Sequence, residues 1–369
     1  MIVEKIRRMD TARGQRLCAL VRTKSQLGAE RAYFTVATGD PRWLPERGDA
    51  FLAALLMPAM SVGEELVVDA PVSARLLESV HTVMDVYHAW WEHLHPVRVT
   101  ATAISSAPRV QDAAVGLFFA AGVNGFHSLL KDRAASERPG HRTVTDLLYV
   151  DFDARGRPAH ERSPDRIRHI CERSGHRPVT VETNLRTLTD PVVDRRAHHG
   201  AALAGVALAL QGHLARCVIA GGDHYRRLPP RGSHPVLDHL WSTERLEFVH
   251  DGAEADPIDK IERRLAHSQL ALDTLDVCPQ SPPATNCGMC GRCLRTMIAL
   301  ELAGVLRLCR TLPPELDVDR LREPSVYTDD SGDAMRSIAA EARARGRLDI
   351  AEAAEAGLRR HTATEAEAS

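Results

Sequence analysis

The stretch AAVGLFFAAGVNGFHSLL, residues 113–130, decides the fold that the sequence predicts. Its first seven residues are a short apolar run typical of a buried strand, and a glycine-containing loop then leads into a helical stretch. Similar apolar runs recur at Leu147–Phe152, Pro178–Thr183, Arg216–Gly222 and Leu246–His250. Helical stretches separate most of them, so the pattern predicts an α/β region with a mostly parallel, doubly wound sheet.

The regions on either side of this α/β region have different patterns. The first 110 residues mix strand-like pieces with the helical stretches Asp49–Met60 and Ser73–Leu94, which predicts a small α+β domain. Towards the end the composition turns charged and alanine-rich, which predicts a helical extension with an amphipathic helix from about Asp333 to Arg360 and a frayed end. The predicted domains are therefore residues 1–110, 111–312 and 313–369.

Charge and hydropathy exclude several classes of protein. The chain has 47 basic and 49 acidic side chains, so it lacks the basic surplus typical of nucleic-acid binding. The longest apolar run, Ala113–Val123, is far shorter than the roughly 20 residues that cross a bilayer. The first twenty residues lack a secretory signal. We therefore expect a cytoplasmic protein that works without membrane or nucleic acid.

Four of the eight cysteines lie in CPQSPPATNCGMCGRC, residues 278–293. Cys278, Cys287, Cys290 and Cys293 have the spacing C-x8-C-x2-C-x2-C, and glycines between the last three permit tight turns. Four soft thiolates close a tetrahedron without an open position for water. The spacing therefore predicts a structural Zn²⁺ site; an iron–sulfur cluster or a redox disulfide pair are the alternatives.

Two of these features together resemble one protein family. The loop, aligned through Phe119, Gly122, Val123 and Phe126, is similar to the PP-loop SGGxDS of the N-type ATP pyrophosphatases. The cysteine spacing is similar to the zinc motif of its 7-cyano-7-deazaguanine synthase branch, and the resemblance covers about residues 112–310. It implies an adenine nucleotide α-hydrolase-like (HUP-like) fold with ATP and Mg²⁺ as cofactors. The implied reaction adenylates a carboxylate or amide-like small-molecule substrate, and a nitrogen or sulfur nucleophile then displaces AMP.

The loop departs from the family in its chemistry. Ala120, Ala121, Asn124 and Gly125 stand where the family has its first Ser, first Gly, Asp and last Ser, and Gly122 alone is retained. Lys131 or Ser128, one turn further on, would have to compensate. The nucleotide-binding residues implied by the resemblance are Ala120, Ala121, Gly122, Asn124, Gly125, Ser128, Asp151 and Asp153. The alternative function is a degenerate PP-loop protein that does not cleave ATP and serves as a ligand- or partner-binding subunit.

Further polar residues follow the later strands and line the crevice in which such sheets bind ligands. The predicted substrate-binding residues are Asn184, Arg186, Asp223, His224, Arg231, Ser233, His234 and Lys260, with His250 and Asp251 beside them. Turn caps and an exposed basic loop are the alternative interpretations of these residues. His198 and His199, within a predicted helix at 190–213, are interpreted as buried histidines. A homodimer or a pathway partner protein is the expected assembly.

Overall fold

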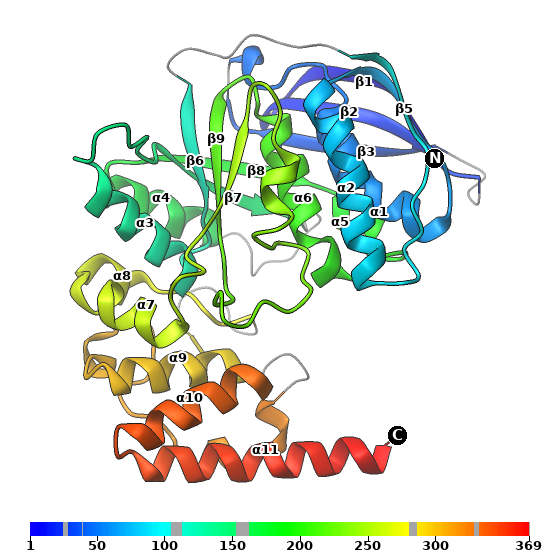
Figure 1. Cartoon of the computed structure of the whole chain (residues 1–369). Coiled ribbons are helices and arrows are strands. Elements are labelled where there is room, and N and C mark those ends of the chain that lie inside the picture. Colours follow the sequence, from blue (N-terminus) through cyan, green and yellow to red (C-terminus); the bar gives the residue numbers. More distant parts are fainter. Residues whose placement is uncertain are drawn as a thin grey trace. The chain divides into compact units, whose positions relative to one another are not determined.

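The computed structural model of the chain describes residues 1–24, 29–38, 40–104, 113–152, 162–279, 286–327 and 332–368. These residues divide into two compact units (Figure 1). The first consists of Met1–Phe119, Asp132–Pro158 and Ser174–Ala253, and the second of Ala120–Lys131, Ala159–Arg173 and Glu254–Ser369. The predicted boundaries at residues 110 and 312 stay a prediction, although strands on both sides of the first boundary share one sheet.

The described strands form one ten-stranded sheet in the order β10-β9-β6-β7-β8-β3-β2-β1-β4-β5. Six of its nine neighbouring pairs are parallel and three are antiparallel. The predicted α/β class with a mostly parallel sheet is therefore confirmed. The strands are β1 (Ile2–Thr11), β2 (Gly14–Arg22), β3 (Ala29–Val36), β4 (Leu66–Val72), β5 (Val99–Ile104), β6 (Ala114–Phe118), β7 (Asp146–Asp151), β8 (Arg177–Thr183), β9 (Leu214–Ala220) and β10 (Glu247–Asp251).

The five strands predicted from the apolar runs make up the parallel half of the sheet. Their order, β10-β9-β6-β7-β8, reverses direction between β6 and β9. In open parallel sheets, ligands bind outside the carboxyl ends of the strands at such a switch point. Gly116 lets neighbouring strands pack closely in this half, because a Cβ there would come within 2.8 Å of Leu148. The topology therefore places the switch point of this half of the sheet between β6 and β9.

The antiparallel hairpin of β1 and β2 was not predicted. Most residues of β1 are exposed or half-buried, Val3 is its single buried residue, and the charged run from Glu4 to Arg8 lacks the apolar content of a core strand. The hairpin continues into β3, which pairs antiparallel with β8. The N-terminal strands thus extend the parallel half instead of forming a sheet of their own.

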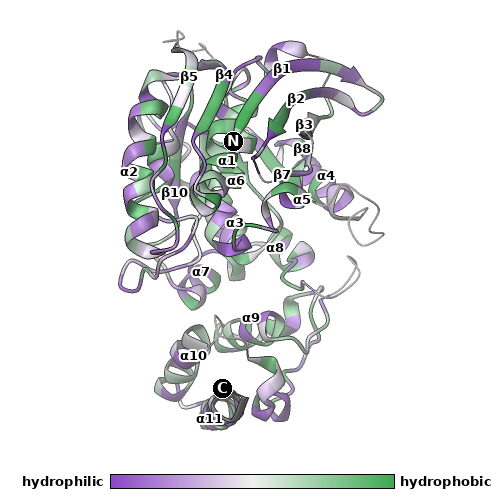
Figure 2. Ribbon diagram, turned by 90° about the vertical axis from the view of Figure 1, so that its right-hand side faces the viewer, coloured by the Kyte–Doolittle hydropathy of each residue, from purple (hydrophilic) through white to green (hydrophobic). Residues whose placement is uncertain are grey.

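Helices α1 and α6 pack against each other in the first unit. Gly205 of α6 lies against α1, where a Cβ would come within 2.9 Å of the Ala50 carbonyl oxygen. Both helices are predominantly hydrophobic in Figure 2. The helices of this unit are α1 (Asp49–Val62), α2 (Ala74–Trp90), α5 (Leu185–Thr189) and α6 (Arg195–Ala209), with short 3-10 turns η1 (Pro41–Trp43) and η3 (Asp238–Trp241).

The predicted start of α6 at Asp190 and Pro191 was wrong. The helix begins at Arg195, because the carboxylate of Asp194 accepts hydrogen bonds from the backbone N–H groups of Arg196 and Ala197, at 2.9 and 3.0 Å. This side-chain cap satisfies N–H groups that a helix leaves unpaired at its first turn. Asp190 instead pairs with Arg195.

The second unit is helical in its described residues. Its helices include α3 (Val123–Ala135), which continues into the first unit, α4 (Arg162–Ser174), α7 (Pro257–Arg263), α8 (Gln269–Thr274), α9 (Gly291–Leu302), α10 (Gly332–Ala344) and α11 (Leu348–Ala368). Short 3-10 turns are η4 (Leu265–His267), η5 (Leu306–Leu308), η6 (Asp319–Arg322) and η7 (Pro324–Val326). No described helix is long and apolar enough to cross a membrane.

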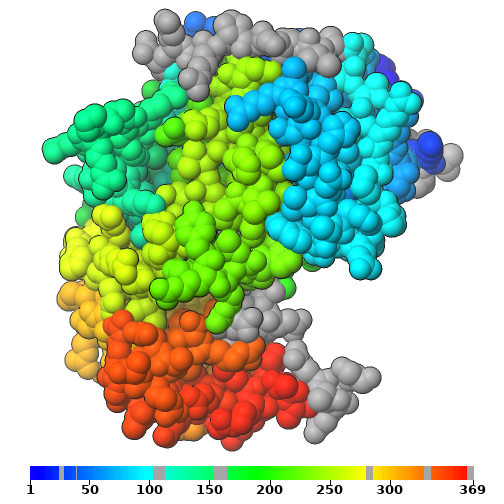
Figure 3. Space-filling view, viewed as in Figure 1, coloured from blue at the N-terminus to red at the C-terminus, as the bar shows by residue number. Residues whose placement is uncertain are grey.

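Two helices predicted in this part of the chain are each divided. The stretch from Pro257 to Leu275 forms α7 and α8 with a 3-10 turn between them. The C-terminal stretch breaks at Gly346, which has a φ of +78°, into α10 and α11. These two helices lie side by side in Figures 1 and 3. Helix α11 continues to Ala368 and buries Ile350 and Ala354 in its first half, and the expected frayed end stays a prediction.

His198 gives the first unit a dependence on pH. Its side chain is buried, and Nε2 lies 2.7 Å from the Ala54 carbonyl oxygen, which confirms it as a buried histidine with a hydrogen-bond partner. The neighbouring His199 is exposed. Burial lowers the pKa of His198 to about 4. The neutral ring therefore stabilises the fold above the ordinary pKa of about 6.5, and this contribution is lost as the pH falls from there towards 4.

We expect His198→Gln, whose amide can still donate to Ala54, to reduce this dependence. Urea denaturation should show the natural protein losing about 2 kcal/mol more than the variant between neutral pH and about pH 5. His81→Gln, at an exposed position of α2, is the matched control and should behave like the natural protein. If the free energy of unfolding depended on pH in the same way in the natural protein and in His198→Gln, His198 would not be the source of this pH dependence.

Candidate functional site

The four predicted thiol ligands come together in the second unit. One sulfur from each of Cys278, Cys287, Cys290 and Cys293 lies within 4.8 Å of all the others. The Sγ atoms of Cys278 and Cys290 are 4.0 Å apart, and those of Cys287 and Cys293 are 3.8 Å apart. Sulfurs bound at about 2.3 Å to one tetrahedral ion are separated by about 3.8 Å. The cluster therefore has the dimensions of a site for a single metal ion.

Local backbone geometry places these sulfurs. Gly288 has a φ of +71°, a conformation that glycine adopts without strain, and a Cβ on it would come within 2.4 Å of Pro313. The turn brings the backbone N–H groups of Met289 and Cys290 to 3.4 and 3.3 Å from the Cys287 sulfur. These hydrogen bonds fix the position of the sulfur, which binds metal as the thiolate. The turn and the start of α9 thus preset three of the four ligands.

Asn286 joins the isolated ligand Cys278 to the other three, a role that was not predicted. Its buried side-chain oxygen accepts hydrogen bonds from the backbone N–H groups of Val277 and Cys278, at 2.8 and 3.0 Å. Its NH2 group donates to the carbonyl oxygens of Leu275 and Thr311, both at 3.0 Å. One amide therefore clamps the chain before Cys278 to the turn that begins at Cys287. The one signal in the sequence was an asparagine directly before a cysteine ligand, and an asparagine at such a position can have many roles.

Replacing Asn286 should weaken the metal site without removing a ligand. In Asn286→Ala the N–H groups of Val277 and Cys278 lose their partner in a buried place, which costs about 1–3 kcal/mol for each group left unsatisfied. We expect faster metal loss to a chelator, measured with a colorimetric zinc indicator, and a lower melting temperature. Met289→Ala is the control, because this exposed residue contributes its backbone N–H alone. Equal rates of metal release from the two variants would refute the role of Asn286.

The loop before α3 has an unusual backbone. Ala121 is buried and has a φ of +57°, a left-handed conformation that costs an alanine about 1 kcal/mol or more. Its carbonyl oxygen accepts a hydrogen bond from the backbone N–H of Asp276, at 2.8 Å. Gly122 has room for a side chain, since a Cβ there would make an ordinary contact, 3.6 Å from the Asp276 carbonyl oxygen. The loop therefore keeps a glycine-type turn with an alanine at the turning residue.

Asn124 and Lys260, both predicted binding residues, meet at the first turn of α3. The Lys260 ammonium donates to the Asn124 side-chain oxygen at 3.0 Å, and the lysine is fully buried. Gly125 and Ser128 are buried in the same helix, whereas Ala120 is exposed. A buried ammonium at a helix N-terminus, where backbone N–H groups also carry partial positive charge, is suited to binding an anion.

Lys131, considered as a compensating phosphate contact, is engaged elsewhere. Its ammonium lies 2.6 Å from the Glu254 carboxylate, which also lies 3.3 Å from the buried ring of His127. Burial raises the pKa of Glu254, but hydrogen bonds from Lys131, its own backbone and His127 outweigh it and lower that pKa to about 2. Glu254 therefore stays ionised and keeps Lys131 paired at neutral pH.

The strain at Ala121 gives a prediction about stability. We expect Ala121→Gly to raise the free energy of unfolding by about 0.5–1 kcal/mol, because glycine adopts this φ without strain. Ala120→Gly is the control, since Ala120 is exposed and does not have a positive φ. It should be neutral or slightly destabilising, as judged by urea titration. An equal decrease in the free energy of unfolding in both variants would contradict a strained turn at Ala121.

Two of the predicted substrate-binding residues in the first unit, Asn184 and Arg186, contact other parts of the protein. The Asn184 side chain pairs with the backbone of β3, accepting from Tyr33 N at 3.0 Å and donating to Arg31 O at 2.7 Å. Arg186 lies over the ring of Phe152, with its guanidinium carbon 4.4 Å from the ring centroid. Asp151 ends β7 and is half-buried. Asp153 lies outside the described residues, and substrate binding by Asn184 and Arg186 stays a prediction.

The loop after β9 gathers most of the other predicted residues. Arg231 pairs with Asp223 at 2.7 Å, and the ring of His224 accepts a hydrogen bond from Arg226 N at 2.9 Å. The predicted residues Ser233 and His234 both bind one buried carboxylate, that of Asp238: the Ser233 hydroxyl at 2.8 Å and the His234 backbone N–H at 3.2 Å. Asp238 was not predicted, because nothing in its spacing from these residues marks it in the sequence.

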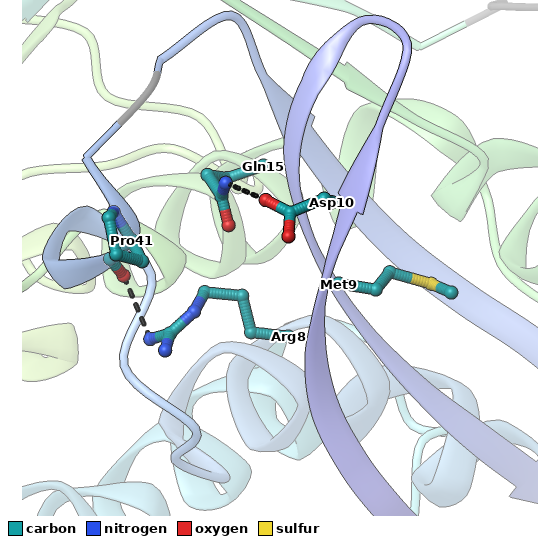
Figure 4. A pocket seen from close by; sticks show the side chains of 5 residues that line it. All are labelled: Arg8, Met9, Asp10, Gln15 and Pro41. Atoms are coloured by element: carbon teal, nitrogen blue, oxygen red, sulfur yellow. Dashed lines mark hydrogen bonds between the residues drawn. The ribbon is translucent and has the colours of Figure 1, made fainter.

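A surface depression of about 380 Å³ lies at the β1–β2 hairpin, lined by Arg8, Met9, Asp10, Gln15 and Pro41 (Figure 4). Its polar groups bind each other: Arg8 donates to the Pro41 carbonyl oxygen at 2.9 Å, and Gln15 donates to Asp10. None of the residues predicted to bind ligand lines it. We therefore assign it no function.

Comparisons with known proteins do not assign the chain to a family. No family model matches the sequence, no curated protein matches it, and no solved structure matches the fold.

Proposed function

We propose that this chain is an ATP-dependent enzyme of the PP-loop class that adenylates a carboxylate or amide-like small molecule. One observation carries the proposal, the left-handed conformation of Ala121 immediately before α3. Strained residues persist where the surrounding structure enforces them, and they cluster at functional sites. A left-handed residue before a helix orients successive backbone N–H groups towards one point, which is the geometry that binds phosphate.

Two further observations support the same proposal. The parallel strands run in the order β10-β9-β6-β7-β8, and β6, which leads into this loop, is next to the switch point. The buried ammonium of Lys260 lies at the first turn of the helix that follows. In the proposed reaction, a substrate oxygen attacks the α-phosphorus of ATP, the bond to the bridging oxygen breaks, and pyrophosphate leaves with its electron pair. The loop N–H groups and Lys260 would stabilise that leaving group.

We propose Zn²⁺ as the metal bound by the four cysteines. Four thiolates around one ion favour a soft or borderline cation over Mg²⁺ or Ca²⁺, which prefer oxygen. Sulfurs within 4.8 Å of one another surround one ion, whereas a multi-iron cluster holds its thiolates further apart around several ions. A closed four-sulfur site leaves no position for water, so the zinc would stabilise the second unit instead of taking part in the reaction.

A second function is favoured by the chemistry of the same loop. Residues 120–125 contain neither a hydroxyl nor a carboxylate, and Asn124 is already bound by Lys260. A loop of this kind can keep its shape and lose ATP cleavage. The alternative is therefore a ligand- or partner-binding subunit, in a biosynthetic pathway, that is built on the same zinc-stabilised scaffold.

Calorimetric titration of the zinc-loaded protein with MgATP, AMP and pyrophosphate separates these functions. We expect MgATP to bind with a Kd in the range of about 1–100 μM, equivalent to about 5–8 kcal/mol. Gly122→Ala is the informative variant, because the added Cβ makes an ordinary contact within the protein but would obstruct a phosphate held by the loop backbone. It should keep its melting temperature and bind MgATP and pyrophosphate at least about tenfold more weakly.

Ser136→Ala, just after the C-terminal end of α3, is the matched control and should bind like the natural protein. In the alternative function, Ala120→Ser with Asn124→Asp should gain nucleotide affinity, since a hydroxyl and a carboxylate would then return to the loop. No heat with any of the three titrants, and none after these two substitutions, would exclude a pyrophosphate role for this loop.

A further inference from the structure

A histidine and a buried aspartate form a pair in the first unit, apart from the residues used in the proposed function. Nδ1 of His250, in β10, lies 2.7 Å from Oδ2 of Asp238 in η3. The Asp238 carboxylate is fully buried, and the His250 side chain is 8 % exposed. At this distance the carboxylate accepts the proton of Nδ1, so that the neutral ring presents its lone pair at Nε2.

The carboxylate of Asp238 is itself held in place. Its oxygens accept hydrogen bonds from the Ser233 hydroxyl at 2.8 Å and the His234 backbone N–H at 3.2 Å. Each of these groups can donate a hydrogen bond, so together with Nδ1 of His250 they fix the position of the carboxylate. A carboxylate fixed by three donors holds the imidazole in one orientation and one tautomer.

Nε2 of His250 lies beside the turn that follows β9. A Cβ on Gly221 would come within 2.2 Å of Nε2, so a side chain at this position would displace the ring. Gly222, next in the chain, is exposed. Hydrogen bonds from Gly221 N to Asp251 O at 2.7 Å and from Tyr225 N to Ala253 O at 2.8 Å tie both ends of this turn to the segment after His250. Among the described residues, Nδ1 of His250 has a hydrogen-bond partner, Asp238, and none is found for Nε2.

We propose that His250 is a general base, oriented by Asp238, for a small ligand that carries an ionisable N–H or O–H group beside Gly221 and Gly222. The ligand's proton moves to Nε2, and the electron pair of the broken bond stays on the ligand's nitrogen or oxygen. The positive charge that forms on the ring lies beside the carboxylate of Asp238, 2.7 Å from Nδ1. Asp238 is a positioning residue. This proposal does not depend on nucleotide binding by the loop before α3.

The test uses the full chain and diethyl pyrocarbonate, a small electrophile that reacts with an imidazole lone pair. Modification is followed by ultraviolet absorbance at neutral pH and located by peptide mass spectrometry. We expect His250 to be modified at Nε2 in the natural protein, and the rate at His250 to fall at least about tenfold in Asp238→Asn, which no longer fixes the tautomer. His250→Gln identifies the signal. His239→Gln, at an exposed histidine next to Asp238, is the control and should leave the rate at His250 unchanged.

A second measurement does not depend on how the variants fold. Long-range proton–nitrogen NMR spectra of protein labelled at histidine report which ring nitrogen carries the proton. The proposal expects a protonated Nδ1 and an unprotonated Nε2 for His250, and mainly the opposite tautomer in Asp238→Asn, whose amide can donate to Nδ1. A proton on Nε2 in the natural protein, or a His250 that diethyl pyrocarbonate does not modify, would overturn the proposal and leave the pair a purely structural contact.

Discussion

The antiparallel pairing of β3 with β8 is the interaction on which the first unit depends. Three residue pairs, from Phe34 with Thr183 to Val36 with Val181, join the N-terminal strands to the parallel strands. Thr183 and Asn184 extend this seam by side-chain hydrogen bonds to the backbone of β3. Without it, β8 would be an open edge with unpaired backbone groups, and the buried face of β3 would lack its neighbour. The β3–β8 pairing thus joins the N-terminal strands and the parallel strands into one sheet with a shared core.

In the second unit, a comparable role falls to side chains that are not ligands. Asn286 satisfies four backbone groups with one amide and so closes the chain around the four thiols. The backbone contributes as well: the N–H of Asp276, two residues before Cys278, donates to the carbonyl oxygen of Ala121. The strained turn before α3 is therefore enforced by the segment that delivers the first thiol. This explains how an alanine can occupy a conformation that glycine prefers.

The sequence predicted the parts of the fold whose signals are local. The strands of the parallel half follow apolar runs, and the cysteine cluster follows from spacing alone, because both depend on neighbouring residues. The charged strand β1 was missed because its composition is not typical of a strand. Its extended conformation depends on backbone pairing with β2 and with β4, which is distant in the sequence. The start of α6 was misplaced because Asp194, not Asp190, provides the cap.

The candidate site was predictable to the same extent. Lys260 and Asn124 are 136 residues apart in sequence and were both named as candidates, but their mutual hydrogen bond is a property of the fold. Asp238 and Asn286 act through partners that no spacing indicates. Both are buried polar residues whose importance comes from what they hold in place.

The short path from Asp276 to Cys278 has a thermodynamic consequence. A ligand that orders the turn at Ala121 also orders the segment carrying the first thiol, and metal binding orders the same segment from its other end. The entropy lost in fixing that segment is lost once, whichever ligand binds first. Metal and loop ligand should therefore bind with positive cooperativity, and by reciprocity each should raise the affinity for the other by the same factor.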